Sequence, residues 1–329
     1  DVWSSAGTMN GALIAVNEGG GFDDCGPADP SVFNNGHGLA ARKVEPRNTP
    51  TTINAAFNFE NFWDGRAKNV FNGVDPFGDR TLAENPLARI VMVDSAARRV
   101  PTSSDLRLAS LRVTNSSLAS QATGPPLSDF EMSCSGRTFH DLGRKLLPNR
   151  ALGSQIVHAQ DSVLGRFSAA GRFFLRYNRL VRLAFDSSLW SGRGRYEIVN
   201  NGGVAQLVRS RTGYTQMELN FAMFFGLAIQ AYEETLISDD SPMDRHFDDR
   251  PGLPNLTPAQ LRGLAVFEGK GLCNDCHNTP VMSAASTISM GLEGVIERMP
   301  MGGDNGPLNP PAVYDNGFYN IGVTRTVAD

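Results

Sequence analysis

The chain has 329 residues, which is enough for about two or three domains of ordinary size. Its formal net charge is −4, which is mild and gives no support to nucleic-acid binding, because nucleic-acid-binding proteins are typically basic. No apolar run of about eighteen residues occurs, so the sequence predicts no membrane-spanning helix.

Residues 1–125 are rich in Gly, Asn and Asp and show little hydrophobic periodicity. They predict loops with short helices, one of them near Thr51–Phe59. The run Gly124-Pro125-Pro126 is typical of a boundary with the next stretch.

Residues 126–250 show the periodicity of helices. We predict one helix over Thr138–Leu147, which Pro148 stops, and another over Arg172–Asp186. The strongest helix prediction covers residues 215–237, which are apolar nearly all round the centre and should be buried. Residues 239–254 then indicate a polar, turn-rich linker.

A further helix should begin at Thr257, a suitable cap, with Pro258 at its first position. Its apolar residues fall near one face, and two glycines end it. The residues concerned are Leu261, Leu264, Ala265 and Phe267 on the face, and Gly269 and Gly271 at the end.

The run Cys273-Asn274-Asp275-Cys276-His277 follows this helix directly and is the attachment signature of c-type haem. Each thiol can add to one vinyl group of the porphyrin, and His277 can reach the iron as an axial ligand. Zinc would need four ligands, and the two other cysteines of the chain are isolated. A thioredoxin-like dithiol would follow a strand instead of a helix.

The other two cysteines, Cys25 and Cys134, lie far apart in the sequence. An oxidising compartment would allow them to form a disulfide. Two unpaired buried thiols are the equal alternative.

Three further segments accompany the haem motif: Arg47–Phe57, Phe62–Ala67 and Tyr314–Val323. In the first two, Arg47-Asn48-Thr49-Pro50 and Phe62-Trp63-Asp64-Gly65-Arg66 are specific in combination. Together with Cys273–His277 they resemble the bacterial di-haem cytochrome c peroxidase and MauG family. The resemblance covers most of the chain.

The resemblance implies a mainly α fold of cytochrome c-like domains with long irregular loops and a helical insertion. Residues 1–125 would be the rest of the N-terminal, peroxidatic domain, 126–250 the insertion, and 251–329 an incomplete C-terminal cytochrome c domain. Cys273, Cys276 and His277 would then hold the electron-relay haem, and Trp63 would lie on the path between two haems. Trp63 has the alternative of a plain core aromatic. Arg66 would neutralise a haem propionate or merely pair with Asp64.

The sequence departs from the family pattern in ways that bear on function. No first Cys-x-x-Cys-His stands upstream of Trp63, and about two hundred residues separate Trp63 from Cys273. Ala88 stands where simple peroxidases carry a distal glutamate, and Glu84 is out of register. Without that group, moving a proton between peroxide oxygens is harder. We therefore expect an internal fragment of an enlarged subfamily.

The sixth ligand of the haem iron is expected beyond the end of the chain, in the family a Met or Tyr. The candidates within the chain are Met282, Met290, Met299 and Met301, which are otherwise packing residues.

The leading functional hypothesis is haem c-dependent electron transfer and peroxide reduction by a periplasmic di-haem oxidoreductase. One haem c would be attached here and a second in the full-length protein. A small redox protein would donate electrons, hydrogen peroxide or oxygen would be the substrate, and the family also allows a homodimer and calcium between domains. A haem oxygenase-type or cofactor-maturation enzyme is one alternative, with Phe71 and Phe77 either lining an apolar distal pocket or anchoring their loop. A single-haem electron carrier is the other.

Overall fold

The sheets of the described residues are short antiparallel pairs of strands. Twelve strands form six separate two-stranded sheets among the described residues, so the prediction of a mainly α fold is wrong. The pairs are β1 (Ser5–Ala6) with β4 (Val44–Glu45), β2 (Asn10–Ala15) with β3 (Asp24–Pro27), β5 (Ile90–Val93) with β6 (Leu106–Ala109), β7 (Ser168–Ala169) with β8 (Arg172–Phe173), β9 (Tyr196–Asn201) with β10 (Val204–Arg209), and β11 (Ile296–Met299) with β12 (Ala312–Asp315).

The β9–β10 hairpin shows why the helical expectation failed. Asn201 pairs with Val204, which leaves Gly202 and Gly203 as a two-residue loop with φ of 60° and 88°. Positive φ at both loop residues is what a type I′ hairpin turn needs, and glycine adopts it at little cost. Alternate strand residues face inward, and Tyr196 is buried. The hairpin lies in the stretch predicted to be a helical insertion.

The computed structural model describes residues 5–31, 33–45, 48–94, 105–248, 256–278, 280–293, 296–299 and 312–315. By their contacts the residues form two units. The first unit comprises Asp1–Pro50 and Val70–Gln230, and the second comprises Thr51–Asn69 and Ala231–Asp329. The predicted three-domain division stays a prediction.

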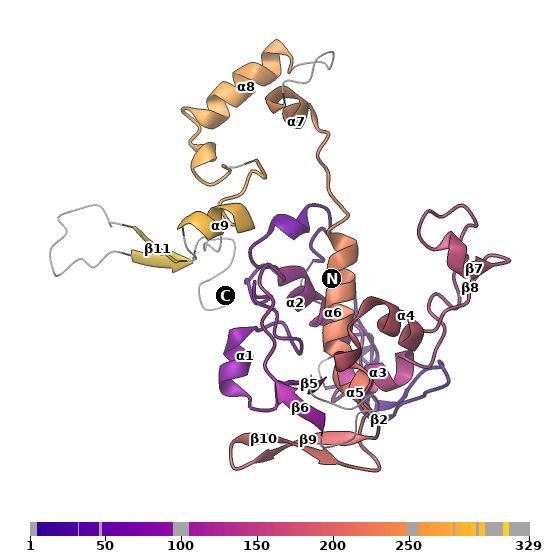
Figure 1. Ribbon diagram of the computed structural model, residues 1–329. Helices are drawn as coiled ribbons and strands as arrows, with labels where there is room; N and C mark the ends of the chain where they lie inside the picture. Colours follow the sequence, from indigo (N-terminus) through magenta and orange to yellow (C-terminus); the bar gives the residue numbers. More distant parts are fainter. Residues whose placement is uncertain are drawn as a thin grey trace. The chain divides into compact units, whose positions relative to one another are not determined.

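Helices are short except α6 and α8, and Figure 1 shows α6 standing among α2, α3, α4 and α5. The α-helices are α1 (Asp79–Glu84), α2 (Ser117–Ala122), α3 (Phe139–Leu146), α4 (Tyr177–Ala184), α5 (Gln216–Leu219), α6 (Phe221–Glu233), α7 (Pro242–Phe247), α8 (Pro258–Glu268) and α9 (Thr287–Glu293). The 3₁₀ turns are η1 (Ala55–Phe57), η3 (Pro125–Leu127), η4 (Gly165–Phe167), η5 (Ser187–Leu189) and η6 (Cys273–Asp275).

Several helix predictions hold in shortened form. The predicted helix over Thr138–Leu147 is α3, capped by Thr138, while the first residues of the Arg172–Asp186 prediction are strand β8 before α4 begins. The helix expected near Thr51–Phe59 is only the single turn η1. Helix α7 lies within the stretch predicted to be a linker.

The apolar stretch 215–237 is two helices instead of one, because Asn220 interrupts it. Its fully buried side chain donates from Nδ2 to the carbonyls of Val91 (2.7 Å) and Leu189 (2.8 Å). Its Oδ1 accepts from the Val91 amide at 2.8 Å. A buried amide satisfied in this way joins β5 and η5 to the break between α5 and α6.

The core of the first unit forms where α6 meets α3, α4 and β5. Gly226 of α6 gives Phe71 room, since a Cβ there would come within 2.9 Å of the Phe71 ring. The buried cluster comprises Ile90, Phe139, Leu147, Val181, Met217, Phe221, Ala222, Met223 and Phe224. The first part of the predicted apolar helix is therefore core, as expected.

A disulfide joins Cys25 on β3 to Cys134, with their Cα atoms 6.2 Å apart. The structure thus selects the disulfide over two unpaired thiols. The carboxylate of Asp23 lies two residues before Cys25 and pairs with Arg137 and with Lys145, whose Nζ is 2.8 Å away. These contacts tie the residue before β3 to α3 and to the residues that precede α3.

In the second unit, segments about two hundred residues apart in the sequence pair with each other. The amide of Phe59 donates to the carbonyl of Ala285 at 3.0 Å, beside a bridge between Asn58 and Ser286. The Ala284 amide in turn donates to the Cys276 carbonyl at 2.9 Å. The residues after the haem motif are thereby bonded to the segment that precedes Trp63.

Candidate functional site

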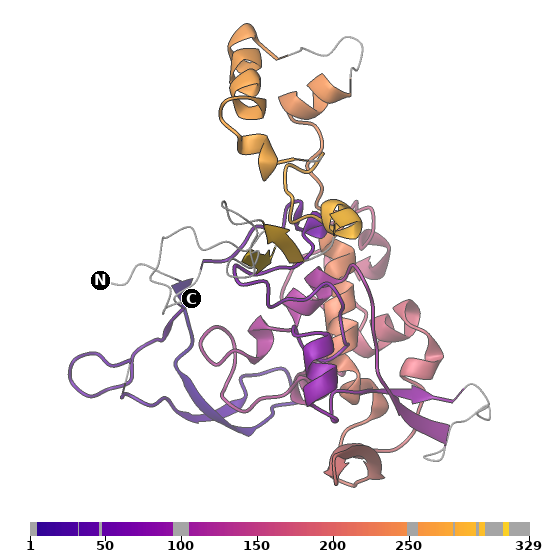
Figure 2. The ribbon, with the colours of Figure 1, turned by 90° about the vertical axis from the view of Figure 1, so that its left-hand side faces the viewer.

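The haem motif is presented by a capped helix and a tight turn, which can be followed in Figure 2. The Thr257 hydroxyl accepts from the Gln260 amide, and the Gln260 side chain accepts from the Thr257 amide at 2.8 Å. This capping box begins α8 where the sequence predicted it. After Gly269, Leu272 takes a left-handed φ of 53° and turns the chain into η6.

The turn η6 brings the three residues of the motif together. The amide of His277 donates to the Cys273 carbonyl at 2.9 Å. Cys273 and Cys276 are unbonded thiols and both are exposed. Two accessible thiols on one turn of backbone, with a histidine next to the second, are the donor set for covalent haem c attachment.

The ring of His277 is held by the backbone of the following loop. Its Nδ1 lies 3.1 Å from the carbonyl oxygen of Met282. Because a carbonyl can only accept, Nδ1 must carry the proton in this contact. The lone pair of a neutral imidazole then lies on Nε2, which is the form that binds a metal ion, with the second nitrogen fixed by an outer hydrogen bond.

Apolar side chains around the motif lie open. No residue of α8 is buried, and Leu261 and Val266 are 42% and 44% exposed. Leu272, directly before the motif, is 68% exposed, and the ring of Phe267 lies 6.2 Å from that of His277. Exposed apolar surface beside three suitable donors fits a large flat apolar group such as haem.

The two other interpretations of the motif lose support. Cys25 and Cys134 are joined to each other, so they offer no thiolates to a zinc site. A thioredoxin-like dithiol would follow a strand, whereas α8 precedes this one. Within the described ranges, no three His, Cys, Asp or Glu side chains gather to hold a metal ion, so calcium has no support there.

A small cleft of about 140 Å³ lies in the second unit, near the loop that follows His277. It is too small for a haem or a drug-sized ligand, whose pockets are typically about 300–1,000 Å³. Its lining residues are Thr51, Ile53, Asn54, Ala55, Phe57, Asn58, Val281, Ser283 and Ser286.

Trp63 belongs to the same unit as the haem motif and is 55% exposed, so it is not a plain core aromatic. It sits in a turn closed by the Asn61–Ala67 bridge. Arg66 donates from Nη1 to both carboxylate oxygens of Asp64, at 2.9 and 3.0 Å, and its guanidinium lies 4.0 Å from the centre of the Phe62 ring. Of the two roles weighed for Arg66, the pairing with Asp64 is the one observed.

The residues considered for a distal pocket lie in the first unit and differ in burial. Ala88 is buried, while Glu84 on α1 is exposed and pairs with Arg80 at 3.3 Å. Phe71 is fully buried against α6, whereas Phe77 is 41% exposed. Phe71 is therefore a core residue.

The methionine candidates occupy different positions. Met282 offers its carbonyl to His277, Met290 on α9 is buried, and Met299 lies in β11. Met301 and Arg47 lie outside the described residues, as does the segment Tyr314–Val323 beyond Asp315.

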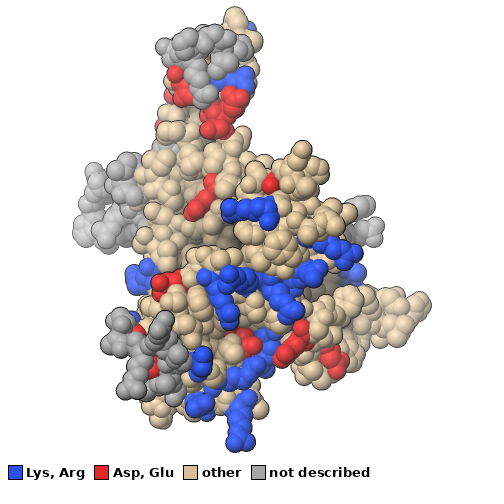
Figure 3. Space-filling view, turned by 45° about the vertical axis from the view of Figure 1, so that its right-hand side comes forward, with Lys and Arg blue, Asp and Glu red and all other residues tan. Residues whose placement is uncertain are grey.

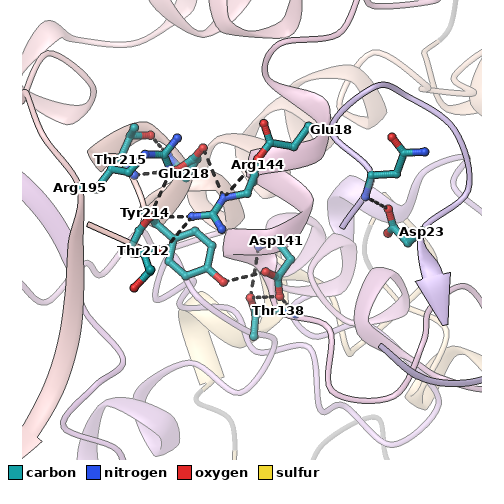
Figure 4. A network of polar contacts seen from close by, with 12 residues as sticks. Glu18, Asp23, Thr138, Asp141, Arg144, Arg195, Thr212, Tyr214, Thr215 and Glu218 are labelled. Atoms are coloured by element: carbon teal, nitrogen blue, oxygen red, sulfur yellow. Dashed lines mark hydrogen bonds and ion pairs between the residues drawn. The ribbon is translucent and has the colours of Figure 1, made fainter. Parts of the chain in front are cut away.

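A polar network between α3 and α5 was not predicted from the sequence (Figure 4). The hydroxyl of Tyr214 donates to Asp141 at 2.7 Å, and Arg144 lies over the Tyr214 ring at 4.2 Å. Burial, together with the bond to Asp141 and its charge, raises the pKa of Tyr214 to about 12. Burial lowers the pKa of the neighbouring His140, against the opposing charge of Asp141.

The local signal for this network was present as two capping boxes, Thr138 with Asp141 and Thr215 with Glu218. Their bond through Tyr214 is a long-range contact that no spacing reveals.

None of the described helices has the length and apolar character needed to cross a bilayer.

A family model described as di-haem cytochrome c peroxidase matches residues 22–170. The chain is 39% identical over 67 residues to the cytochrome-c peroxidase IdrP1 of Pseudomonas sp. strain SCT, which is 20% of this chain and 17% of that protein. It is 24% identical over 269 residues to the cytochrome c551 peroxidase of Pseudomonas aeruginosa PAO1, which is 81% of this chain and 45% of that protein. The resemblance to the di-haem cytochrome c peroxidase family is confirmed.

The chain therefore spans less than half the length of each of these curated relatives. No solved structure matches it.

Proposed function

We propose that this chain, which resembles the di-haem cytochrome c peroxidases, holds a haem c through Cys273 and Cys276 with His277 as axial ligand. The observation that carries this proposal is the His277–Met282 contact, which prepares Nε2 as a ligand beside two exposed thiols. When bound, the haem supplies one-electron redox chemistry, while the protein sets its ligation and exposure.

The haem on His277 is the electron-relay haem in this proposal, and the full-length protein carries a second haem c. A small redox protein donates two electrons in turn, and hydrogen peroxide accepts them with two protons to give two water molecules. Haem c attachment and the resemblance to periplasmic peroxidases support an extracytoplasmic location, and the observed Cys25–Cys134 disulfide suits it. The proposal also includes that the full-length protein forms a homodimer.

The test of attachment uses the full-length gene product and a matched pair of double variants. Cys273→Ser/Cys276→Ser should lose one covalently bound haem, counted by pyridine haemochrome absorbance. Cys25→Ser/Cys134→Ser also removes two cysteines, which form a disulfide outside the motif, and should keep that haem. Equal haem content in the two variants would contradict the assignment, and a single haem in the unaltered full-length protein would sink the di-haem proposal.

Trp63 is proposed to carry electrons between the two haems, and its position in the same unit as the haem motif supports this role. Trp63→Phe should leave the haem count unchanged and slow electron transfer between haems, followed by stopped-flow absorbance after reduction of one haem. Phe57→Leu is the control, since Phe57 also lies in the Thr51–Asn69 part of the second unit and is an aromatic without an indole.

An oxygenase or maturation activity is the second candidate, and Ala88 favours it. A peroxidase needs a proton-transfer group beside the peroxide, and the residue at this position is a buried methyl group while Glu84 is held at the surface by Arg80. The peroxidase and oxygenase proposals are distinguished by measuring how fast a reduced small cytochrome or copper protein is oxidised in the presence of hydrogen peroxide. An oxygenase should oxidise that donor poorly. The single-haem carrier predicts fast exchange with the donor and no peroxide turnover at all.

A further inference from the structure

Positive charge is concentrated in one part of the first unit. Residues 150–211 contain ten arginines, no lysine and three acidic residues, although the whole chain has 34 acidic residues against 30 basic ones. Figure 3, which brings the α4 side of Figure 1 forward, shows Lys and Arg side chains gathered in a band across that face. The local excess is therefore a property of this part of the fold and runs against the net charge of the chain.

Two of these arginines are placed directly opposite each other. An isolated antiparallel bridge pairs Arg150 with Arg176. The flanking bonds run from the Ala151 amide to the Leu175 carbonyl (3.0 Å) and from the Tyr177 amide to the Asn149 carbonyl (3.1 Å). This is the non-hydrogen-bonded kind of pair, in which side chains lie closest. Two like charges directly opposite each other on paired strands destabilise the fold, and an anion bound between them would remove this repulsion.

Helix α4 extends this pair into a row. Arg176 is the N-cap of α4, and Arg179 and Arg182 follow it at intervals of three residues, so each arginine is a surface neighbour of the next. We call Arg150, Arg176, Arg179 and Arg182 the arginine surface. All four are exposed, and none forms an ion pair with another described residue.

Local contacts hold these side chains without neutralising them. Arg176 donates from Nη1 to the carbonyl of Pro148 at 3.1 Å. The guanidinium of Arg182 lies 5.5 Å from the centre of the Trp190 ring. The nearest acidic residue along the chain, Asp186, already accepts from the Ser188 amide at 2.8 Å as the cap of η5.

We propose that the arginine surface docks a partner protein whose contact face is rich in carboxylates. Guanidinium groups bind carboxylates through two parallel hydrogen bonds, and charge complementarity of this kind steers and orients a partner. A lipid surface fits less well, because α4 turns its apolar side inward. Val181 is buried, and Tyr177 and Leu180 pack on core clusters. Leu183 is the one large apolar side chain of α4 that is exposed, and a single residue is not the continuous apolar face with which a helix enters a bilayer.

The test uses the full-length holoprotein, with poly-L-glutamate as the probe for carboxylates and phosphatidylglycerol vesicles as the probe for anionic lipid. Poly-L-glutamate should bind at low salt and be released as salt rises. Arg179→Gln/Arg182→Gln should weaken that binding by roughly five- to tenfold, which is about 1.0–1.4 kcal/mol for the two exposed ion pairs together. Arg179→Lys/Arg182→Lys keeps the charge but loses the planar guanidinium group, so its affinity for poly-L-glutamate should lie between those of the unaltered protein and the glutamine variant.

The matched control is Arg107→Gln/Arg211→Gln, which removes two exposed arginines of the first unit outside the arginine surface. An equal loss in this control would show a net-charge effect and overturn the proposal. So would failure of poly-L-glutamate to bind at low salt. Tighter binding to the vesicles that depends on Arg179 and Arg182 would assign the surface to lipid instead. Salt-sensitive self-association abolished by the same variant, seen by sedimentation, would make it a contact between copies of this chain.

Discussion

The Nδ1 atom of His277 lies 3.1 Å from the carbonyl oxygen of Met282, five residues further along the chain. This contact fixes the ring by a backbone group, so the orientation of the ligand does not depend on the Met282 side chain. It also places Met282 on the side of the imidazole that faces away from Nε2. Since Nε2 is the atom that would hold the iron, Met282 is a poor candidate for the sixth ligand.

Met282→Gly tests this placement. Met282 has a left-handed φ of 57°, which glycine adopts without strain, and the substitution keeps the carbonyl. We expect an unchanged haem count and unchanged axial ligation in the ferric and ferrous spectra, with stability altered by no more than about 1 kcal/mol. His277→Gln should change the ligation spectrum and serves as the comparison. Loss of a methionine–iron band in Met282→Gly would show that its sulfur is the ligand after all.

The parts of the structure that the sequence predicted are the ones set by near neighbours in the chain. Thr257, Pro258 and Gly269 bound α8 through capping chemistry that spans at most a few residues, and the haem motif follows directly. The β9–β10 hairpin also has a local signal, Gly202-Gly203 between alternating apolar residues, although the stretch around it has a helical period.

Other features depend on contacts that spacing cannot reveal. The pairing of Phe59 with Ala285 crosses more than two hundred residues, and it places the segment that precedes Trp63 against the haem loop. The Cys25–Cys134 bond spans 109 residues, and two isolated cysteines carry no information about whether they meet. Asn220 could be read only as one polar residue in an apolar helix, because its partners Val91 and Leu189 come from elsewhere in the first unit.

Removing the disulfide should destabilise the first unit strongly. Closing a loop of about 100 residues is worth about 4.7 kcal/mol in the chain-entropy model, because it restricts the unfolded chain. We expect Cys25→Ser/Cys134→Ser to lower the free energy of unfolding by about 4 kcal/mol in urea denaturation followed by circular dichroism. Reduction of the unaltered protein by dithiothreitol should give the same midpoint. If the free energy of unfolding falls by less than about 1 kcal/mol both in the double variant and in the reduced protein, the result would contradict the disulfide.

Asp23→Asn should lower the free energy of unfolding by about 3–5 kcal/mol, because it leaves Arg137 and Lys145 without their shared carboxylate. All three side chains are largely buried, with exposed fractions of 2%, 11% and 17%. Asp129→Asn is the matched control: its carboxylate is 39% exposed and pairs with Lys43 at 2.9 Å, so the loss should stay below about 1 kcal/mol. Equal losses for the two variants in urea denaturation would contradict the difference in burial.

The same Asp23 cluster should also appear in the acid response. Burial by itself raises the pKa of Asp23, but hydrogen bonds from Lys145 and the Asn17 amide and the charges of Arg137 and Lys145 outweigh it and hold the pKa below its usual value. A lowered pKa in the folded state means that the stabilisation is complete above the ordinary Asp value and is lost as pH falls through the lowered one. Stability measured from pH 6 downward should therefore fall less steeply in Asp23→Asn than in the unaltered protein.

Tyr214→Phe should weaken the link between α3 and α5 and change the alkaline response of the protein. The variant loses the 2.7 Å bond to Asp141, which should cost about 1–2 kcal/mol at neutral pH. Because the folded-state pKa is raised to about 12, the contribution of the neutral hydroxyl is complete below the ordinary tyrosine value of about 10. This contribution is lost as pH rises from about 10 to about 12, because in that range the tyrosine of the unfolded chain is ionised while Tyr214 of the folded protein still keeps its proton.

Unfolding midpoints in urea, measured at intervals from pH 8 to 12, check this prediction. The unaltered protein should lose stability across the upper part of that range, and Tyr214→Phe should lose less, so the two curves approach each other. Tyr232→Phe is the control, since Tyr232 is 63% exposed and lies outside the network. Parallel curves for the unaltered protein and Tyr214→Phe would mean that the alkaline loss comes from other groups.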